Sequence, residues 1–394
     1  MKVINIEKAR QERKLNKRKV FWTAIITFAL IISAVIFALY VGNESFRIFF
    51  DKYIFRKEIN EDNKNIINLA YEDSENIYAY NDKIVVLIKN NLYTYNQSGK
   101  EESNLEINIS NPIFASSNRF LAVAENKGKR IYSISGNNIV WQKELNGNIS
   151  KIHVNKNGYI SVVILDTTYK NIIKTFDESG KELFTTFLPS TNVIDIEISN
   201  DNKYMAFAEI DTSGTMIESK VRTINIENAK TDSTNSFENI YEAEKGKLIT
   251  NIKYQDRNSL VCMYDNSIEI IHNNKGDNIT DFSPTDTSFI TIDLYGHVAK
   301  IYEKSTGIFT ADTQINFIDV NSKKESIYTA KGACKDIYSR DNIIAMNMGS
   351  EVHFVNTNGW LAKKYISSQE VKDVVIGSGI AGIVYKDKIE IINL

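Results

Sequence analysis

The spacing of apolar and polar residues changes character along the chain, and the first change defines a membrane segment. Val20 to Val41 is a run of 22 residues without a charge. As a helix rising about 1.5 Å per residue it would be roughly 33 Å long, enough to cross a hydrocarbon core of about 30 Å. The pattern predicts a transmembrane helix over residues 20–41, with the lipid bilayer as its partner.

An apolar run of this kind can also belong to a signal peptide, a lipoprotein or a buried helix of a soluble protein, and each alternative fits less well. A cleavable signal peptide has a run of about 7 to 15 apolar residues followed by small residues, whereas this run is longer and ends in Ala38-Leu39-Tyr40. No cysteine lies near its end, which argues against a lipoprotein. A buried helix of a soluble protein seldom runs past about 14 apolar residues. We therefore expect an uncleaved single-span anchor.

A second pattern follows between residues 42 and 64. Five apolar residues recur at helical spacing and five charged residues occupy the other face: Phe46, Phe49, Phe50, Tyr53 and Ile54 against Arg47, Asp51, Lys52, Arg56 and Lys57. This predicts an amphipathic juxtamembrane helix that lies in the outer headgroup layer, dimerises or packs on the next domain. Residues 58–65 are polar and predict a short linker.

From residue 65 onward, short runs of β-branched and aromatic residues alternate with Asn, Asp, Ser and Gly, which predicts an all-β domain over residues 65–394. A local motif recurs, as in YTYNQSGK at 93–100 and KTFDESGK at 174–181. Its turn residues are Asn96, Ser135, Asp177, Glu227, His272, Asn321, Asn356 and Asn393, with a mean step of about 42 residues. That is the period of a four-stranded propeller blade.

The third unit shows the predicted strands most clearly: 150–154, 159–165, 172–176 and 182–188. The last unit, ending in IEIINL, lacks one strand, and the apolar segment Ile67 to Glu72 (INLAYE) is placed to supply it. Closure of the ring in this way avoids an exposed sheet edge. We expect a β-propeller of eight blades, with seven as the alternative because the two longest steps could hide insertions.

Charge fixes the orientation of the predicted span. Residues 1–20 carry a net charge of +6 within a chain whose net charge is −2. The positive-inside rule keeps residues 1–19 in the cytoplasm as a basic tail and exports everything after Val41. A nearly neutral chain whose remainder is acidic argues against a nucleic-acid partner.

Three segments resemble the repeats of quinoprotein-like (PQQ-like or WD40-like) propellers: SGNNIVWQKEL at 135–145, DESGKELFTTFL at 177–188 and NTNGWLAKKYI at 356–366. In those repeats a Gly turn leads to an aromatic residue that docks between blades, and Trp141 matches this position best. The arrangement of tail, span and propeller is similar to an uncharacterised clostridial and Firmicutes family of single-span membrane proteins. The resemblance implies a propeller in a bacterial plasma membrane and no activity. No residue matches a quinone or metal ligand, so no cofactor is expected.

Residues able to carry chemistry are scattered. The four histidines, at 153, 272, 297 and 353, stand singly and outside any metal-ligand spacing, and His153 and His353 are expected at strand surfaces. Cys262 and Cys334 are expected to be buried, reduced thiols. The segment GSGIAG at 377–382 leads into a strand and not a helix, so it predicts a hairpin turn. The sequence therefore predicts no catalytic, cofactor-binding or metal-binding residue, and no enzyme.

These observations favour a non-catalytic docking module for cell-envelope proteins or polymers, anchored by residues 20–41. The longest insertions, at 211–220 and 230–244, are the first expected contact regions. The alternative is a small-molecule sensor or enzyme with a site in the propeller channel. A polar or charged cluster at the channel mouth would favour that alternative, and an apolar or small-residue lining would count against it.

Overall fold

The computed structural model describes residues 17–55, 57–59, 65–70, 76–233, 236–256, 259–272, 274–307 and 311–394. The chain forms two units, residues 1–59 and residues 60–394. Residues 1–16 of the expected basic tail and residues 60–64 of the expected linker lie outside the described residues.

The first unit is helical. Helix α1 (Lys17–Gly42) contains the predicted span, and its segment Arg18–Gly42 is long and apolar enough to cross a membrane, a property that N-terminal signal sequences share. The Asn43 side chain accepts the N–H of Phe46 and caps helix α2 (Glu44–Phe49). Helix α2 continues into one turn of π-helix, η2 (Phe50–Ile54), and a two-residue strand, β1 (Glu58–Ile59), follows.

Burial in this unit does not follow the two predicted faces. Asp51 of the charged set is only 7% exposed, whereas Phe49 and Ile54 of the apolar set are more than half exposed. The cause is local: the Tyr40 hydroxyl donates to Asp51 Oδ1 at 2.7 Å, and this bond turns the carboxylate inward.

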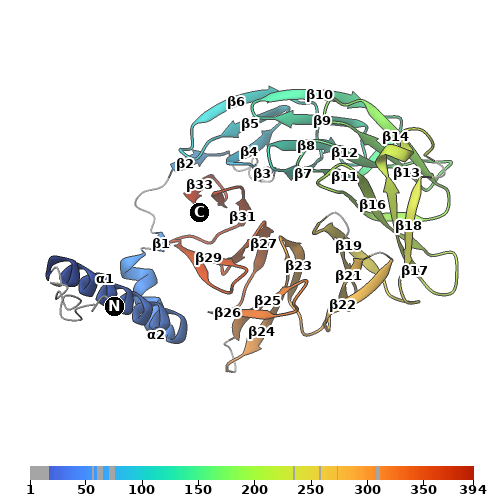
Figure 1. The fold of residues 1–394 in the computed structure, drawn as a ribbon. Helices are drawn as coiled ribbons and strands as arrows, with labels where there is room; N and C mark the ends of the chain where they lie inside the picture. Colours follow the sequence, from blue (N-terminus) through green and yellow to red (C-terminus); the bar gives the residue numbers. More distant parts are fainter. Residues whose placement is uncertain are drawn as a thin grey trace, which may run out of the picture. The chain divides into compact units, whose positions relative to one another are not determined.

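The second unit is an eight-bladed β-propeller whose sheets are arranged in a ring (Figure 1). Each blade is built on four antiparallel strands, and we number the blades 1 to 8 in chain order. The expected count of eight is therefore correct, and seven is not. In blade 8 the outermost strand is β2 (Asn65–Asn68), which pairs with β33 in the register Asn65↔Ile391. The closing strand thus begins two residues before the predicted segment.

The strands of blades 1 to 4 are β3 (Ile77–Tyr80), β4 (Lys83–Ile88), β5 (Asn91–Tyr95) and β6 (Glu101–Glu106); β7 (Pro112–Ser117), β8 (Phe120–Glu125), β9 (Arg130–Ser135) and β10 (Asn138–Glu144); β11 (Asn148–Val154), β12 (Ile160–Leu165), β13 (Asn171–Phe176) and β14 (Glu182–Leu188); β15 (Asn192–Ile198), β16 (Tyr204–Asp211), β17 (Glu218–Asn225) and β18 (Phe237–Glu242). A short helix, α3 (Ile226–Ala229), follows β17. The four strands predicted for the third unit agree with β11 to β14 within two residues.

The strands of blades 5 to 8 are β19 (Ile249–Tyr254), β20 (Ser259–Tyr264), β21 (Ser267–His272) and β22 (Lys275–Asp281); β23 (Phe289–Leu294), β24 (His297–Ser305), β25 (Ala311–Asp319) and β26 (Glu325–Lys331); β27 (Asp336–Arg340), β28 (Ile343–Asn347), β29 (Glu351–Asn356) and β30 (Leu361–Ile366); β31 (Asp373–Ile376), β32 (Ile380–Val384), β33 (Lys388–Asn393) and β2. Residues 377–379 form the turn between β31 and β32, as predicted for the Gly-rich segment.

The recurring sequence motif forms the turn after the third strand of a blade. In blade 3, Asp177 Oδ1 accepts the N–H groups of Ser179 and Lys181, each at 2.9 Å. Gly180 follows with φ +84°, a conformation that a side chain rarely adopts. The same pattern at Asn96 and Asn356 explains why the motif is visible in the sequence.

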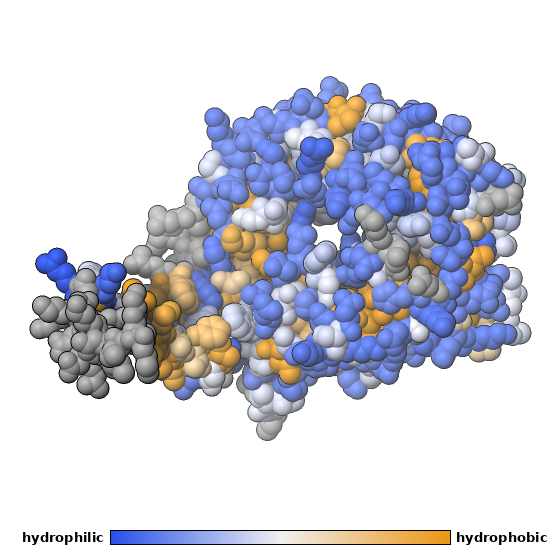
Figure 2. Space-filling view, viewed as in Figure 1, coloured by the Kyte–Doolittle hydropathy of each residue, from blue (hydrophilic) through white to orange (hydrophobic). Residues whose placement is uncertain are grey.

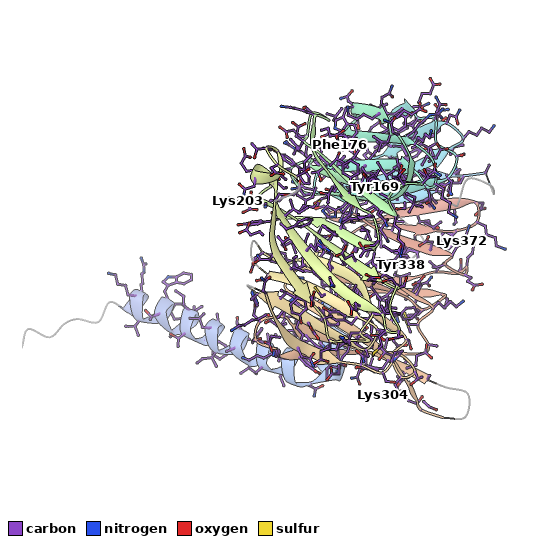
Figure 3. All side chains as sticks on the ribbon, turned by 90° about the vertical axis from the view of Figure 1, so that its right-hand side faces the viewer. Tyr169, Phe176, Lys203, Lys304, Tyr338 and Lys372 are labelled. Atoms are coloured by element: carbon purple, nitrogen blue, oxygen red, sulfur yellow. The ribbon has the colours of Figure 1, made fainter. Side chains whose placement is uncertain are left out.

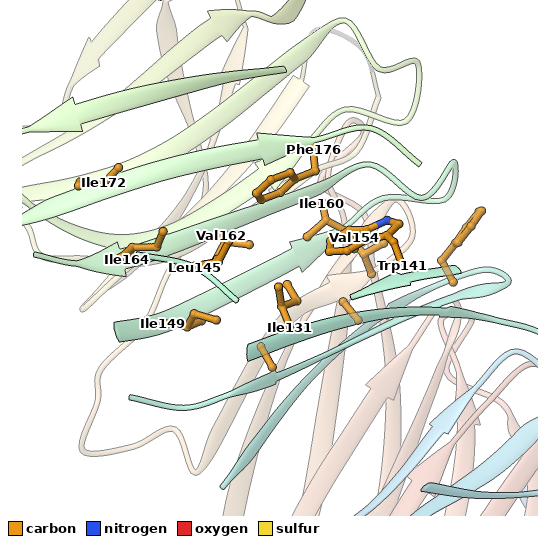
Figure 4. Close-up of a cluster of buried hydrophobic side chains, with 13 residues drawn as sticks. Ile131, Trp141, Leu145, Ile149, Val154, Ile160, Val162, Ile164, Ile172 and Phe176 are labelled. Atoms are coloured by element: carbon orange, nitrogen blue, oxygen red, sulfur yellow. The ribbon is translucent and has the colours of Figure 1, made fainter. Parts of the chain in front are cut away.

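Side chains fill the space between neighbouring sheets (Figure 3), and the contact of blades 2 and 3 shows how. Trp141 of β10 is 8% exposed and lies 5.6 Å from the Phe176 ring of β13 (Figure 4). A Cβ atom added to Gly180 would lie 2.7 Å from the Trp141 ring. Trp141 therefore docks on the Gly turn of the next blade, as the resemblance to quinoprotein-like repeats implies.

A candidate binding site in the central channel

The innermost strand of every blade contributes to one central cavity. Strands β3, β7, β11, β15, β19, β23, β27 and β31 line a space of about 740 Å³. Figure 2 shows the opening in the middle of a largely hydrophilic face. Cavities of this size are typical of ligand sites.

Equivalent positions in the eight strands form a single ring of side chains, which we call the inner ring. Each member is the last residue but one of its strand, and each lines the cavity. The members are Ala79, Ser116, His153, Glu197, Lys253, Asp293, Ser339 and Val375. Because each blade repeats the same four-stranded arrangement, these residues line one cavity although neighbouring members lie about 40 residues apart in the chain.

Blades 3 to 6 supply four ionisable members, which we call the charged half. His153 Nδ1 lies 3.2 Å from Glu197 Oε1, and Lys253 Nζ lies 3.6 Å from the same oxygen. Lys253 Nζ is also 3.8 Å from Asp293 Oδ1. A chain of neighbouring ionisable side chains thus crosses three blade boundaries. The two Lys253 distances exceed hydrogen-bond length, and its side chain is 36% exposed.

The charged half shifts the pKa of several groups. Glu197 raises the pKa of Lys253 above its ordinary value, because its attraction outweighs the lowering by partial desolvation. Burial alone would raise the pKa of Glu197, but His153 and Lys253 outweigh this effect and lower the pKa below its ordinary value, so Glu197 stays ionised. Behind Glu197, burial raises the pKa of Asp195 to about 6, and the Glu197 charge adds to this effect. Asp195 Oδ2 accepts the N–H of Ile252 at 2.9 Å, which joins blade 4 to blade 5.

Blades 7, 8, 1 and 2 form the closing half, where the members of the inner ring are Ser or apolar. Arg340, the last residue of β27, extends over this half. Its Nη1 donates to the carbonyl oxygens of Ala79 at 3.0 Å and Ile376 at 3.2 Å, and lies 3.5 Å from Ser116 Oγ. One guanidinium group therefore joins blade 7 to blades 8, 1 and 2.

Aromatic hydroxyls complete the lining. Tyr338 of β27, labelled in Figure 3, has its hydroxyl 3.3 Å from Asp336 Oδ2. Burial raises the pKa of Tyr338, and its hydrogen bond to Asp373 raises it further, so the phenol stays protonated. Tyr295 at the edge of the cavity is 75% exposed. Together with the inner ring, these groups offer a ligand charges, hydroxyls and ring faces.

The structure brings only one of the four histidines to this site. His153, expected at an ordinary strand surface, is part of the charged half. His353, expected at a strand surface, is 6% exposed and lies 3.0 Å from both Tyr328 Oη and Glu351 Oε2. His272 and His297 bond locally to Ser259 Oγ and the Tyr295 carbonyl.

The predictions for the cysteines are confirmed: both are free and buried. Burial raises the pKa of Cys262 well above its ordinary value and that of Cys334 to about 12, so neither thiol is a nucleophile at neutral pH. Within the described part of the chain, no group of three or more His, Cys, Asp or Glu residues is arranged to hold a metal ion.

The two expected insertions are smaller than the sequence suggests. Strands β16 and β17 reduce the first loop to residues 212–217, and β18 occupies residues 237–242 of the second. The first loop precedes β17 and the second follows it, so they lie at opposite ends of blade 4. Lys220 of the first insertion nevertheless forms an ion pair of 2.9 Å with Glu242 of the second. The inner ring, in contrast, draws on all eight blades.

Comparison with known proteins agrees with this fold. Residues 56–394 match the model of a family described as "Family of unknown function (DUF5711)". No curated protein matches the chain by sequence.

Two solved structures are similar to the propeller. BamB from Moraxella catarrhalis has a TM-score of 0.52 and 9% identity, covering 84% of this chain and 98% of that chain. The C-terminal WD40 domain of Sif2 has a TM-score of 0.54 and 12% identity, covering 84% of this chain and 99% of that chain. At such identities the likeness shows the fold alone.

Proposed function

The chain belongs to the DUF5711 family, and we propose that this member is a membrane-anchored binding protein of the bacterial envelope. Residues 20–41 cross the plasma membrane, residues 1–19 stay in the cytoplasm, and the propeller lies outside. There the mouth of its channel docks a group that projects from an envelope protein or polymer. The protein acts without catalysis.

The inner ring is the observation that carries this proposal. Its charged half places Glu197, Lys253 and Asp293 on the wall of the cavity, whereas the ring residues of its closing half, Ala79, Ser116, Ser339 and Val375, carry no charge. A projecting group of a partner would enter the cavity and meet these charges. Specificity in such a site comes from charge and shape together.

Two features favour binding over catalysis. Glu197 holds both His153 and Lys253, so the only histidine of the channel is already engaged by a carboxylate. Among the described residues, no serine or cysteine is hydrogen-bonded to His153, which leaves this histidine without a nucleophile to activate.

The test is affinity capture from crosslinked cells that produce the tagged full-length protein. We expect specific envelope components with the parent and their loss in the double variant Glu197→Gln/Lys253→Met. The matched control is Lys304→Met, at an exposed lysine of β24 labelled in Figure 3. A version truncated after residue 64 tests the propeller as a whole. Equal capture by the parent and the truncated version would assign binding to the membrane-proximal segment and refute the proposal.

A second function, binding of a free small molecule in the channel, is favoured by one specific observation. The Lys253 side chain lines the cavity and is 36% exposed, and its ammonium group lies 3.6 and 3.8 Å from the carboxylates of Glu197 and Asp293. A small polar molecule with both donors and acceptors would satisfy Lys253 and Asp293 together. Native mass spectrometry of the full-length protein, released from mild detergent, would detect such a molecule as added mass that Lys253→Met loses.

A further inference from the structure

The end of the predicted span is tied to the segment that follows it. Tyr40 is the last residue but one of the uncharged run 20–41. Its hydroxyl donates to Asp51 Oδ1 at 2.7 Å and accepts from Lys57 Nζ at 3.0 Å, while Lys57 Nζ and Asp51 Oδ1 form an ion pair of 2.8 Å. The chain therefore folds back, and residues 51 and 57 lie at the same level as Tyr40.

Aromatic rings pack around this polar contact. The Tyr40 ring lies 6.4 Å from that of Phe50 and 5.8 Å from that of Phe55, and Phe50 lies 4.9 Å from Phe46. We call the six residues of this cluster, Tyr40, Phe46, Phe50, Asp51, Phe55 and Lys57, the juxtamembrane knot.

The same segment exposes apolar surface. Phe49, Ile54 and Phe55 are 51%, 56% and 55% exposed. Apolar area in water costs about 25 cal/mol per Å², so three large neighbouring side chains in contact with water are unfavourable. The depth of the juxtamembrane knot determines whether these three side chains contact water or lipid.

We propose that the juxtamembrane knot lies in the outer headgroup layer of the bilayer, with Phe49, Ile54 and Phe55 facing the acyl chains. This inference rests on the proposed anchoring by residues 20–41. If that segment crosses the membrane, the Tyr40 side chain is at the outer interface, and a hydrogen bond of 2.7 Å fixes Asp51 at the same depth. Aromatic and lysine side chains are those that favour this interface.

The charges of the knot are compatible with this position. The Asp51 carboxylate is 7% exposed, but Tyr40 and Lys57 both contact it, so it enters the interface already paired. Lys57 also lies over the rings of Tyr40 and Phe55, at 5.7 and 5.6 Å from their centroids.

A lipid surface explains the exposed residues better than a second copy of the chain does. Helices α2 and η2 together cover 11 residues, fewer than two heptads. A stable helical pair needs apolar positions sustained over about three to four heptads. The lipid surface, in contrast, is adjacent to the end of α1 without any further partner.

The experiment places a spin label on single introduced cysteines in the full-length protein, reconstituted into phosphatidylethanolamine and phosphatidylglycerol vesicles. The native Cys262 and Cys334 are buried, and the parent protein gives the labelling background. Phe49→Cys and Ile54→Cys test the knot, Ile31→Cys tests the middle of α1, and Ser213→Cys on an exposed propeller loop is the water control. Collision rates with oxygen and with a water-soluble nickel complex report the depth of each label.

We expect labels at positions 49 and 54 to favour oxygen, at a depth shallower than position 31, and the label at 213 to favour nickel. A deep label at 31 with nickel-accessible labels at 49 and 54 would overturn the inference while the anchoring stands. A nickel-accessible label at 31 would refute the anchoring itself, and with it this inference. Spin–spin broadening at 49 and 54 without oxygen preference would identify a second copy as the occupant and overturn the lipid assignment.

A second variant tests the hydrogen bond that sets the depth. Tyr40→Phe keeps the ring but removes the hydroxyl that joins Asp51 and Lys57. We expect the label at position 49 to become more accessible to nickel in this background, while the label at 31 is unchanged. Identical profiles with and without the hydroxyl would show that the knot does not set the depth of the segment.

Discussion

Neighbouring blades are joined differently in the two halves of the channel wall. In blades 3 to 6, ionisable side chains of the inner ring interact with each other across blade boundaries. In blades 7, 8, 1 and 2 the ring residues are small, and Arg340 binds main-chain carbonyl oxygens instead. The closing half contains blade 8, in which β2 and β31 to β33 come from opposite ends of the propeller and are joined by the pairing of β2 with β33. Arg340 cross-links the blades around this pairing. In blades 3 to 6, by contrast, the ionisable side chains of the inner ring line the cavity.

The largest expected effect lies at the border of the two halves, where Trp141 of blade 2 docks on blade 3. Trp141→Ala removes a buried indole from its contact with Phe176, and we expect a loss of about 3 to 5 kcal/mol in the free energy of unfolding. Denaturant unfolding of the detergent-solubilised protein measures this, with Trp141→Phe as the milder control. A loss below about 1 kcal/mol would mean that the halves are not joined through this contact.

The next effect tests the closing half directly. Arg340→Ala leaves the carbonyl oxygens of Ala79 and Ile376 without their charged donor, and we expect a loss of about 2 to 3 kcal/mol. Hydrogen exchange should accelerate first in blades 7, 8 and 1, whereas blades 4 and 5 stay protected. Acceleration spread evenly over all blades would contradict a local role in ring closure.

Asp195, which lies beside the charged half, should give the stability of the protein a pH dependence of its own. The pKa of Asp195 is about 6 in the folded protein against an ordinary value of 3.8, a difference equivalent to roughly 3 kcal/mol. The folded state binds this proton more tightly, so the stabilisation is complete below pH 4, declines as pH rises to 6 and is absent above.

The variant Asp195→Asn removes this titration. The new amide oxygen still accepts one N–H, so we expect a gain of about 1 to 2 kcal/mol over the parent at pH 8 that shrinks toward pH 4. Thermal unfolding from pH 4 to 8 measures the difference. A gain that is equal at both ends of the range would show that Asp195 is not the titrating group.

The variant Lys253→Met should change the free energy of unfolding least and partner binding most. Lys253→Met leaves Glu197 paired with His153, so we expect a loss of only about 1 kcal/mol. Partner capture should nevertheless fail, because the charge that faces the cavity is gone. Lys304→Met should change neither property. A Lys253 variant that unfolds but still captures partners would reverse the roles that we assign to the two halves.

The sequence predicted the ring because each blade repeats its turn chemistry. Asp177 with Gly180, and the same pair of positions in other blades, mark the third strand of a blade through an Asx turn that needs those residue types. The closing strand was predicted slightly late for a physical reason. Only Ile67 is buried in β2, while Asn65, Ile66 and Asn68 face solvent, so the segment lacks the run of apolar residues that marks an inner strand.

The inner ring was not predicted because its members are far apart in the chain and of unlike chemistry. His153, Glu197, Lys253 and Asp293 share no local motif, and each alone is ordinary at the end of a strand. Their shared signal is positional: each stands one residue before the end of the first strand of its blade. That signal is available once all four strands of every blade are assigned, and strand limits were predicted from the sequence for the third unit only.

Ring closure by β2 also determines when the propeller becomes resistant to proteolysis. The pairing Asn65↔Ile391 joins residues 326 positions apart, among the most distant contacts of the chain. A growing chain leaves the edge of β2 unpaired until residues 388–393 have been synthesised. Contacts of such sequence separation form slowly. Proteases would therefore distinguish chains that contain residues 388–393 from chains interrupted before them, because β2 pairs with β33 to close the ring.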